Sequence, residues 1–298
     1  MKYRLCALLL LLGLVFGLTA CSSKTVASGD CGENVTWALD ENGKLTISAT
    51  RRGAKMDDYS LSTSEYSTPK LPPWAIYRES VTSIAIKENV EYIGQYAFAE
   101  FYTALKKVTI SKGTTYIGDR AFFNCTALEE VSLPNSLVSL GESVFGGCTS
   151  LESVVIPKNV TNLSPATFFE CAALKNVELP DGLTIVSDAA FMKCTSLESI
   201  TLPQNLLTID QFAFGDCSSL ASITIPESTT TIGEMAFYGC SSLKSMYIPG
   251  NTTAIAFSAL YDCNALQDIY YGGTIEQWRA LDIDFAGALS KVTIRTLR

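Results

Sequence analysis

Apolar and polar residues alternate along most of this chain in a short pattern that returns every 23 residues. One copy reads "LESVVIP", in which Leu151, Val154 and Ile156 are the regular apolar positions. Alternation with a period of two predicts a short strand that buries one face. A proline follows most copies, and proline suits a strand end because it lacks an N–H to donate. We therefore expect one short strand in each 23-residue unit.

A second block in each unit carries a phenylalanine and a cysteine. The phenylalanines are Phe122, Phe145, Phe168, Phe191, Phe214 and Phe237. The cysteines are Cys125, Cys148, Cys171, Cys194, Cys217, Cys240 and Cys263. The small residues before them suit a tight turn or the start of one or two helical turns. Since such a unit cannot bury its apolar face alone, we expect the copies to stack into a solenoid.

The evenly spaced cysteines allow three interpretations. In a stack, equivalent residues lie about 5 Å apart, which a disulfide accepts. Equivalent side chains point the same way, however, and seven is an odd number. A zinc site needs ligands that converge on one point, and the chain contains no histidine. We expect a structural ladder of buried free thiols and no metal. Cys31 lies outside this ladder.

The strand pattern extends beyond the copies that carry both phenylalanine and cysteine. It opens at Val81 and closes at Ile294, with ten strand positions from Ile84 to Val292. The repeat resembles the leucine-rich repeats of BspA-like bacterial surface proteins. This resemblance implies an α/β solenoid, a right-handed superhelix with a cap at each end.

The two ends of the repeat array differ from it. Asp40-Glu41-Asn42-Gly43 joins two alternating runs, and Asn-Gly is a strong hairpin signal. Near the C-terminus, "YYGGTIEQWRAL" resembles the capping segment of the family, with Trp278 over the last core layer. The expected divisions are a signal peptide (1–20), a tether (21–30), an N-terminal β-rich capping module (31–80), leucine-rich repeats (81–271) and a C-terminal capping repeat (272–298).

The N-terminus predicts export. Lys2 and Arg4 precede an apolar run that is too short for a membrane-spanning helix. The run ends in "LTAC", which resembles a bacterial lipoprotein signal, and such signals are cut before the cysteine. The resemblance implies a lipid on Cys21 that anchors the chain to a membrane, and Ser22 favours display at the outer surface. The alternative is an ordinary signal peptide with an incidental cysteine.

Composition narrows the choice of partners and chemistry. The 30 acidic and 22 basic residues give a net charge of −8, which argues against nucleic acid as a partner. Histidine, the side chain that most often acts as a general base, is absent from the sequence. The sequence also contains no glycine-rich phosphate-binding motif. Paired carboxylates could act as in a glycosidase, but the acidic residues fall at solvent positions of the repeat. We expect no enzymatic activity and no cofactor.

Between the core positions of each strand, side chains point outward onto the concave sheet. The middle of this surface is mostly small and hydroxylated, and Tyr247 and Tyr270 form an aromatic step near its C-terminal end. Exposed tyrosines stack on sugars or anchor protein contacts, although tyrosine also simply favours strands. The candidate ligand-binding residues are Val155, Asn176, Glu178, Tyr247, Asp268 and Tyr270.

By resemblance, the expected protein is a monomeric, non-enzymatic recognition protein at the bacterial cell surface. It would mediate adhesion or bind a protein or a glycan through the solenoid. One alternative is a structural envelope lipoprotein that acts as a scaffold or spacer for a partner in the same cell. Another is an accessory protein that captures glycans.

Overall fold

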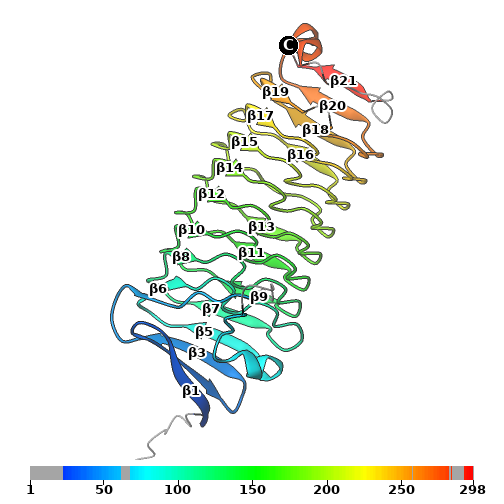
Figure 1. The fold of residues 1–298 in the computed structure, drawn as a ribbon. Helices are drawn as coiled ribbons and strands as arrows, with labels where there is room; N and C mark the ends of the chain where they lie inside the picture. Colours follow the sequence, from blue (N-terminus) through cyan, green and yellow to red (C-terminus); the bar gives the residue numbers. More distant parts are fainter. Residues whose placement is uncertain (1–22, 62–67, 257, 282, 284–291, 298) are drawn as a thin grey trace, which may run out of the picture.

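The computed structural model describes residues 23–61, 68–256, 258–281, 283 and 292–297. The chain winds into an elongated solenoid with an antiparallel β-meander at its N-terminal end (Figure 1). Successive coils lie side by side, 23 residues apart over most of the solenoid and 24 residues apart between β5 and β7, as the repeat spacing predicts. The C-terminal strands lie at the opposite end of the solenoid (Figure 1).

One row of strands runs along the solenoid where the sequence places it, except that its last strand is shifted by two residues, because Ile294 and not Val292 pairs with Ile269. Most neighbouring members pair in parallel, so that Tyr247 faces Tyr270 and Val155 faces Glu178. Residues 199–201, the sixth of the ten expected positions, are not a strand. The row comprises β5 (Ser83–Ile86), β7 (Lys107–Ile110), β9 (Glu130–Ser132), β11 (Ser153–Val155), β13 (Asn176–Glu178), β16 (Ser222–Thr224), β18 (Ser245–Ile248), β20 (Asp268–Tyr271) and β21 (Thr293–Thr296).

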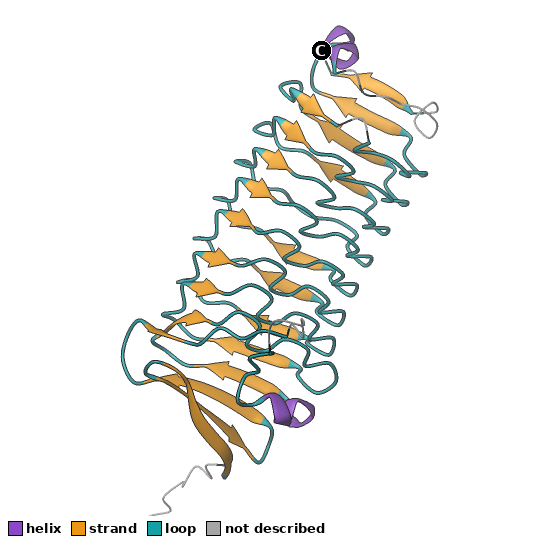
Figure 2. Cartoon of the chain, viewed as in Figure 1, coloured by secondary structure: helices purple, strands orange, loops and turns teal. Residues whose placement is uncertain are grey.

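A second row of short strands lies a few residues after the first-row position of each unit (Figure 2). The sequence pattern indicates only a turn there, and the parallel pairing of neighbouring coils extends the turn into a strand. The row comprises β4 (Ala54–Lys55), β6 (Val90–Ile93), β8 (Tyr116–Ile117), β10 (Ser139–Leu140), β12 (Asn162–Leu163), β14 (Ile185–Val186), β15 (Thr208–Ile209), β17 (Thr231–Ile232) and β19 (Ala254–Ile255).

The expected helical turns around each phenylalanine are wrong, and consecutive tight turns take their place. In one unit, Ala166 and Glu170 adopt left-handed backbone angles, with φ of 54° and 59°. In this segment, the N–H of Phe168 donates to the carbonyl oxygen of Ala190 at 2.9 Å, and the N–H of Glu170 donates to the carbonyl oxygen of Met192 at 2.8 Å. Bonds to the next coil therefore replace the bonds within a helix, and the described chain holds little helix.

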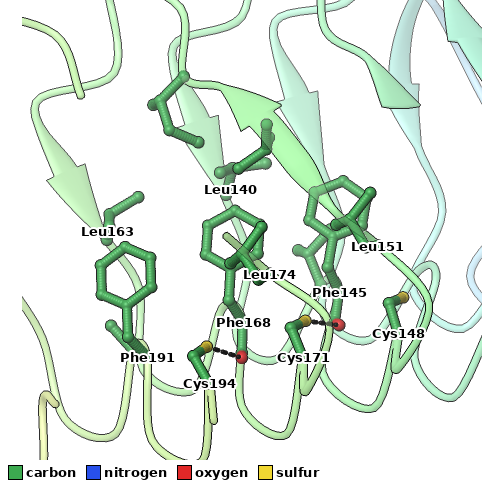
Figure 3. Packing of buried hydrophobic residues seen from close by; sticks show 14 of the residues in the cluster. Leu140, Phe145, Cys148, Leu151, Leu163, Phe168, Cys171, Leu174, Phe191 and Cys194 are labelled. Atoms are coloured by element: carbon green, nitrogen blue, oxygen red, sulfur yellow. Dashed lines mark hydrogen bonds between the residues drawn. The ribbon is translucent and has the colours of Figure 1, made fainter. Parts of the chain in front are cut away.

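The phenylalanines form a continuous stack through the core (Figure 3). The Phe168 ring lies 5.7 Å from that of Phe145 and 5.6 Å from that of Phe191, with the planes within 9° of parallel. All three side chains are fully buried beside rows of leucine. The stack joins each coil to both neighbours, which explains the unbroken 23-residue spacing.

A meander of three strands, β1 (Thr25–Gly32), β2 (Val35–Asp40) and β3 (Lys44–Ala49), precedes the coils. The third strand pairs in parallel with β5 and so continues the first row. Trp74, just before the 3-10 helix η1 (Ala75–Ser80), stacks on Phe98 at 5.2 Å. Its indole N–H donates to the Ala97 oxygen at 2.9 Å. Trp74 thus extends the phenylalanine stack by one position.

The C-terminal end carries the helix α1 (Ile275–Ala280). Thr274 and Gln277 form a capping box at its start, which satisfies free N–H groups of the first turn. Trp278 is buried and packs edge-on against Tyr271, with ring centres 5.1 Å apart. Among the described residues, none of the helices is long and apolar enough to span a membrane. The domain boundaries given above stay predictions.

Candidate functional site

The cysteine ladder lies inside the core. Cys31 and the seven ladder cysteines are free and buried. Each ladder thiol donates to the carbonyl oxygen of a phenylalanine 26 residues earlier, or 27 residues earlier for Cys125: Cys171 Sγ lies 3.1 Å from Phe145 O, and Cys194 Sγ lies 3.3 Å from Phe168 O (Figure 3). Burial raises the pKa of Cys217 to about 12. The protonated thiol is a poor nucleophile and metal ligand.

No group of three or more histidine, cysteine, aspartate or glutamate side chains that could hold a metal ion occurs among the residues with described positions. Charged side chains instead form ion pairs between equivalent positions of neighbouring coils. Lys107 and Glu130 lie 2.8 Å apart, and Lys175 and Glu152 lie 3.7 Å apart. These pairs are about half exposed, so they contribute little to stability and tune the charge of the surface.

Three of the sequence-predicted binding residues lie together on β11 and β13. Val155 and Glu178 are direct partners in the strand register, and Asn176 pairs with Ser153. Val155, the last residue of β11, is 57% exposed, which is unusual for an aliphatic side chain on a strand. This group combines an apolar surface with carboxylate and amide groups.

The other three predicted residues lie near the C-terminal end, on β18 and β20. Tyr247 and Tyr270 are register partners, and Tyr270 is 37% exposed. The Tyr247 hydroxyl donates to a Glu227 carboxylate oxygen. Asp268 accepts a hydrogen bond from Arg295 Nε at 2.8 Å. The six candidates therefore form two separate groups on one strand row. Cys21, the predicted lipidation site, lies outside the described residues.

Two adjoining hollows open beside β9, β11 and β13. One, of about 290 Å³, is lined by residues that include Glu130, Leu133 and Val155. The other, of about 430 Å³, is lined by residues that include Val155 and Glu178. Sequence reasoning missed three polar residues of these walls, Asn135, Lys158 and Asp181. They follow the strand prolines and lie outside the strand pattern, although their even spacing of 23 residues could have identified them.

Parallel coils with one buried core that runs through all of them define a leucine-rich repeat solenoid. This fold typically serves as a non-enzymatic binding scaffold. The family model described as "BspA type Leucine rich repeat region" matches residues 70–194 and 162–281, with six copies. This chain belongs to the family of BspA-type leucine-rich repeat proteins.

Solved structures of similar fold include two leucine-rich repeat proteins from other bacteria. A leucine-rich repeat protein from Bacteroides ovatus is 25% identical, with a TM-score of 0.57 over 89% of this chain and 76% of that one. A leucine-rich repeat protein from Eubacterium ventriosum is 21% identical, with a TM-score of 0.58 over 83% of this chain and 73% of that one. The comparison with curated proteins found no match. Leucine-rich repeat proteins generally bind protein ligands.

Proposed function

We propose that this chain is a surface-anchored adhesion protein that binds a protein ligand on its first strand row. One observation carries the proposal: outward side chains on this row change from coil to coil while the core beneath them stays constant. Val155, Glu178 and Tyr270 occupy equivalent positions and differ in size, charge and polarity. A rigid backbone with variable side chains provides a preorganised binding surface, which lowers the entropic cost of association.

Membrane attachment is the second part of the proposal, and the N-terminal sequence supports it. Lys2 and Arg4, the apolar run and "LTAC" together form a lipoprotein signal, with Cys21 as the acceptor of the lipid. Metabolic labelling with a palmitate analogue should mark the wild-type chain and leave Cys21→Ser unlabelled. Equal labelling of Cys21→Ser would refute lipidation at this residue.

Outer-surface display separates adhesion from the scaffold alternative. Protease added to intact cells should remove the chain, whereas a chain that supports a partner inside the envelope is protected until the cells are broken. The matched control is an internal envelope protein, whose survival shows that the cells stayed intact. Complete protection of both proteins would contradict the proposed display at the surface.

Substitution of Tyr247 and Tyr270 tests whether the C-terminal part of the first strand row takes part in adhesion. Tyr247→Ala combined with Tyr270→Ala should weaken binding to a protein captured by the full chain, with the melting temperature nearly unchanged. Thr109→Ala provides a control at an equivalent exposed position of an early coil. Unaltered affinity of the tyrosine variant would remove this pair from the binding surface. Binding to a glycan array in place of proteins would favour glycan capture.

A further inference from the structure

The first strand row is interrupted in the middle of the solenoid. A six-stranded sheet ends at β9, β11 and β13 form a two-stranded sheet by themselves, and the next sheet begins at β16. Three strand positions near these interruptions end in Leu-Pro: Leu133, Leu179 and Leu202. Their equivalents elsewhere, Ile156, Ile225 and Ile248, carry β-branched side chains, which suit strands better. At each interruption, at least one of the two adjoining coils has leucine, and not isoleucine, before the proline.

The interruption exposes part of the core. Val131, Leu133, Val177 and Leu179 are only partly buried, although they stand at core positions. Their equivalents in uninterrupted coils, such as Val108 and Ile225, are completely buried. The two hollows at this place share Asn135, Val155 and Pro157 in their walls. Together they form one trough across three coils, which we name the β9–β13 trough.

The charges around the β9–β13 trough favour a basic ligand. Glu130 lies 2.8 Å from Lys107, which neutralises it. Along the described chain, no ion pair joins Glu178 or Asp181 to a basic side chain. Lys158 is the remaining charged residue of the wall, which leaves two acidic groups against one basic group. The apolar side chains of Val155, Leu133 and Leu179 line the same walls.

We propose that the β9–β13 trough binds an extended peptide segment of a protein partner, in which aliphatic residues alternate with lysine or arginine. The aliphatic side chains pack against Val155 and the exposed parts of Leu133 and Leu179. The basic side chains reach the carboxylates of Glu178 and Asp181. Successive side chains of an extended peptide point to opposite sides. A peptide in which aliphatic and basic residues alternate therefore presents its aliphatic side chains on one side and its basic side chains on the other. This inference rests on the proposed function and gives it a location and a ligand class.

The test uses the full chain and two synthetic peptides, acetyl-Gly-Arg-Val-Arg-Val-Gly-amide and its analogue with glutamate in place of arginine. Binding is followed by the methyl NMR signals of valine and leucine during titration. The arginine peptide should shift the signals of Val155, Leu133 and Leu179 with saturation, and the glutamate peptide should bind at least about tenfold more weakly. Shifts centred on other coils, or equal binding of both peptides, would overturn the inference, as would no saturation by the arginine peptide.

Substitutions locate the contacts. The double variant Glu178→Gln with Asp181→Asn should bind the arginine peptide about tenfold more weakly than the wild type. Glu234→Gln, on an exposed turn of another coil, should leave the affinity for this peptide unchanged. Val155→Thr keeps the shape of an exposed side chain and should weaken binding about threefold. Equal affinities of all these variants would refute the assignment.

The outcomes also separate this inference from the proposed function. If a captured protein partner loses affinity for Tyr247→Ala with Tyr270→Ala while the peptides fail to bind the trough, the peptide inference fails and the adhesive function stands. If the captured partner binds the turns on the opposite side of the coils, the proposed location on the strand row fails. Saturable binding of a glycan in the trough, with no binding of the arginine peptide, would replace a peptide ligand by a saccharide.

Discussion

Phe168 provides the sharpest test of how the solenoid is held together. Its ring is fully buried and stacked on both sides, 5.7 Å from Phe145 and 5.6 Å from Phe191. Phe→Ala substitution in a packed core costs about 3–5 kcal/mol of unfolding free energy. Each lost aromatic contact is worth about 0.5–1.5 kcal/mol, so the loss for Phe168→Ala should lie in the upper part of that range.

The adjacent Phe169 is a matched control. It belongs to the same turn but is half-buried, and its ring lies under the Lys193 ammonium group at 5.3 Å. We expect Phe169→Ala to cost only about 1 kcal/mol. Urea unfolding, followed by circular dichroism, measures both values with the wild type as reference. A loss below about 2 kcal/mol for Phe168→Ala, or equal losses for the two variants, would refute the stacked-core account.

Three further predictions follow from the buried polar groups. Trp74→Phe keeps the stack on Phe98 but removes the donor to Ala97 O, and should cost about 1–3 kcal/mol in urea unfolding; Trp37→Phe, whose Nε1 has no partner, should cost less. In the chain from Ser22 onward, which lacks Cys6 and Cys21, the eight described cysteine thiols should react with Ellman's reagent at pH 8 only after denaturation, and their reaction in the native chain would contradict their burial. Because the unfolded Cys217 thiol loses its proton near its ordinary pKa of 9.0 and the folded one only near 12, the contribution of Cys217 to stability is complete below pH 9 and is lost as pH rises from 9 to 12. In Cys217→Ala, the decline of the unfolding free energy over this interval should be smaller by about 1.4 kcal/mol per pH unit, and an unchanged slope would contradict the raised pKa.

The repeat spacing was sufficient to predict the stacking of the coils. Since equivalent residues of a solenoid occupy equivalent places, the spacing from Phe145 to Phe168 fixes the register of the whole core. The left-handed turns could not be predicted in the same way. Arg120, Ala166 and Phe212 adopt positive φ, yet their residue types have no preference for it. The hydrogen bonds to the next coil impose this backbone conformation, so it is a tertiary effect.

The candidate binding surface was only partly predictable from the sequence. The outward positions of Val155 and Glu178 follow from strand alternation, because successive side chains point to opposite faces. The trough beside them depends on where the sheet is interrupted, and the alternation of apolar and polar residues does not give that place. Asp181 and Lys158 enter its wall from turns, and the strand pattern gives no direction for their side chains.

Hydrogen exchange of the full chain, with and without a saturating protein ligand identified by direct titration, tests the central claim most directly. The account predicts slower amide exchange on the first strand row, with the largest change in β9, β11 and β13 and little change in the turns around Phe168 and Phe191. Protection confined to those turns, with the strand row unchanged, would contradict binding on the strand surface.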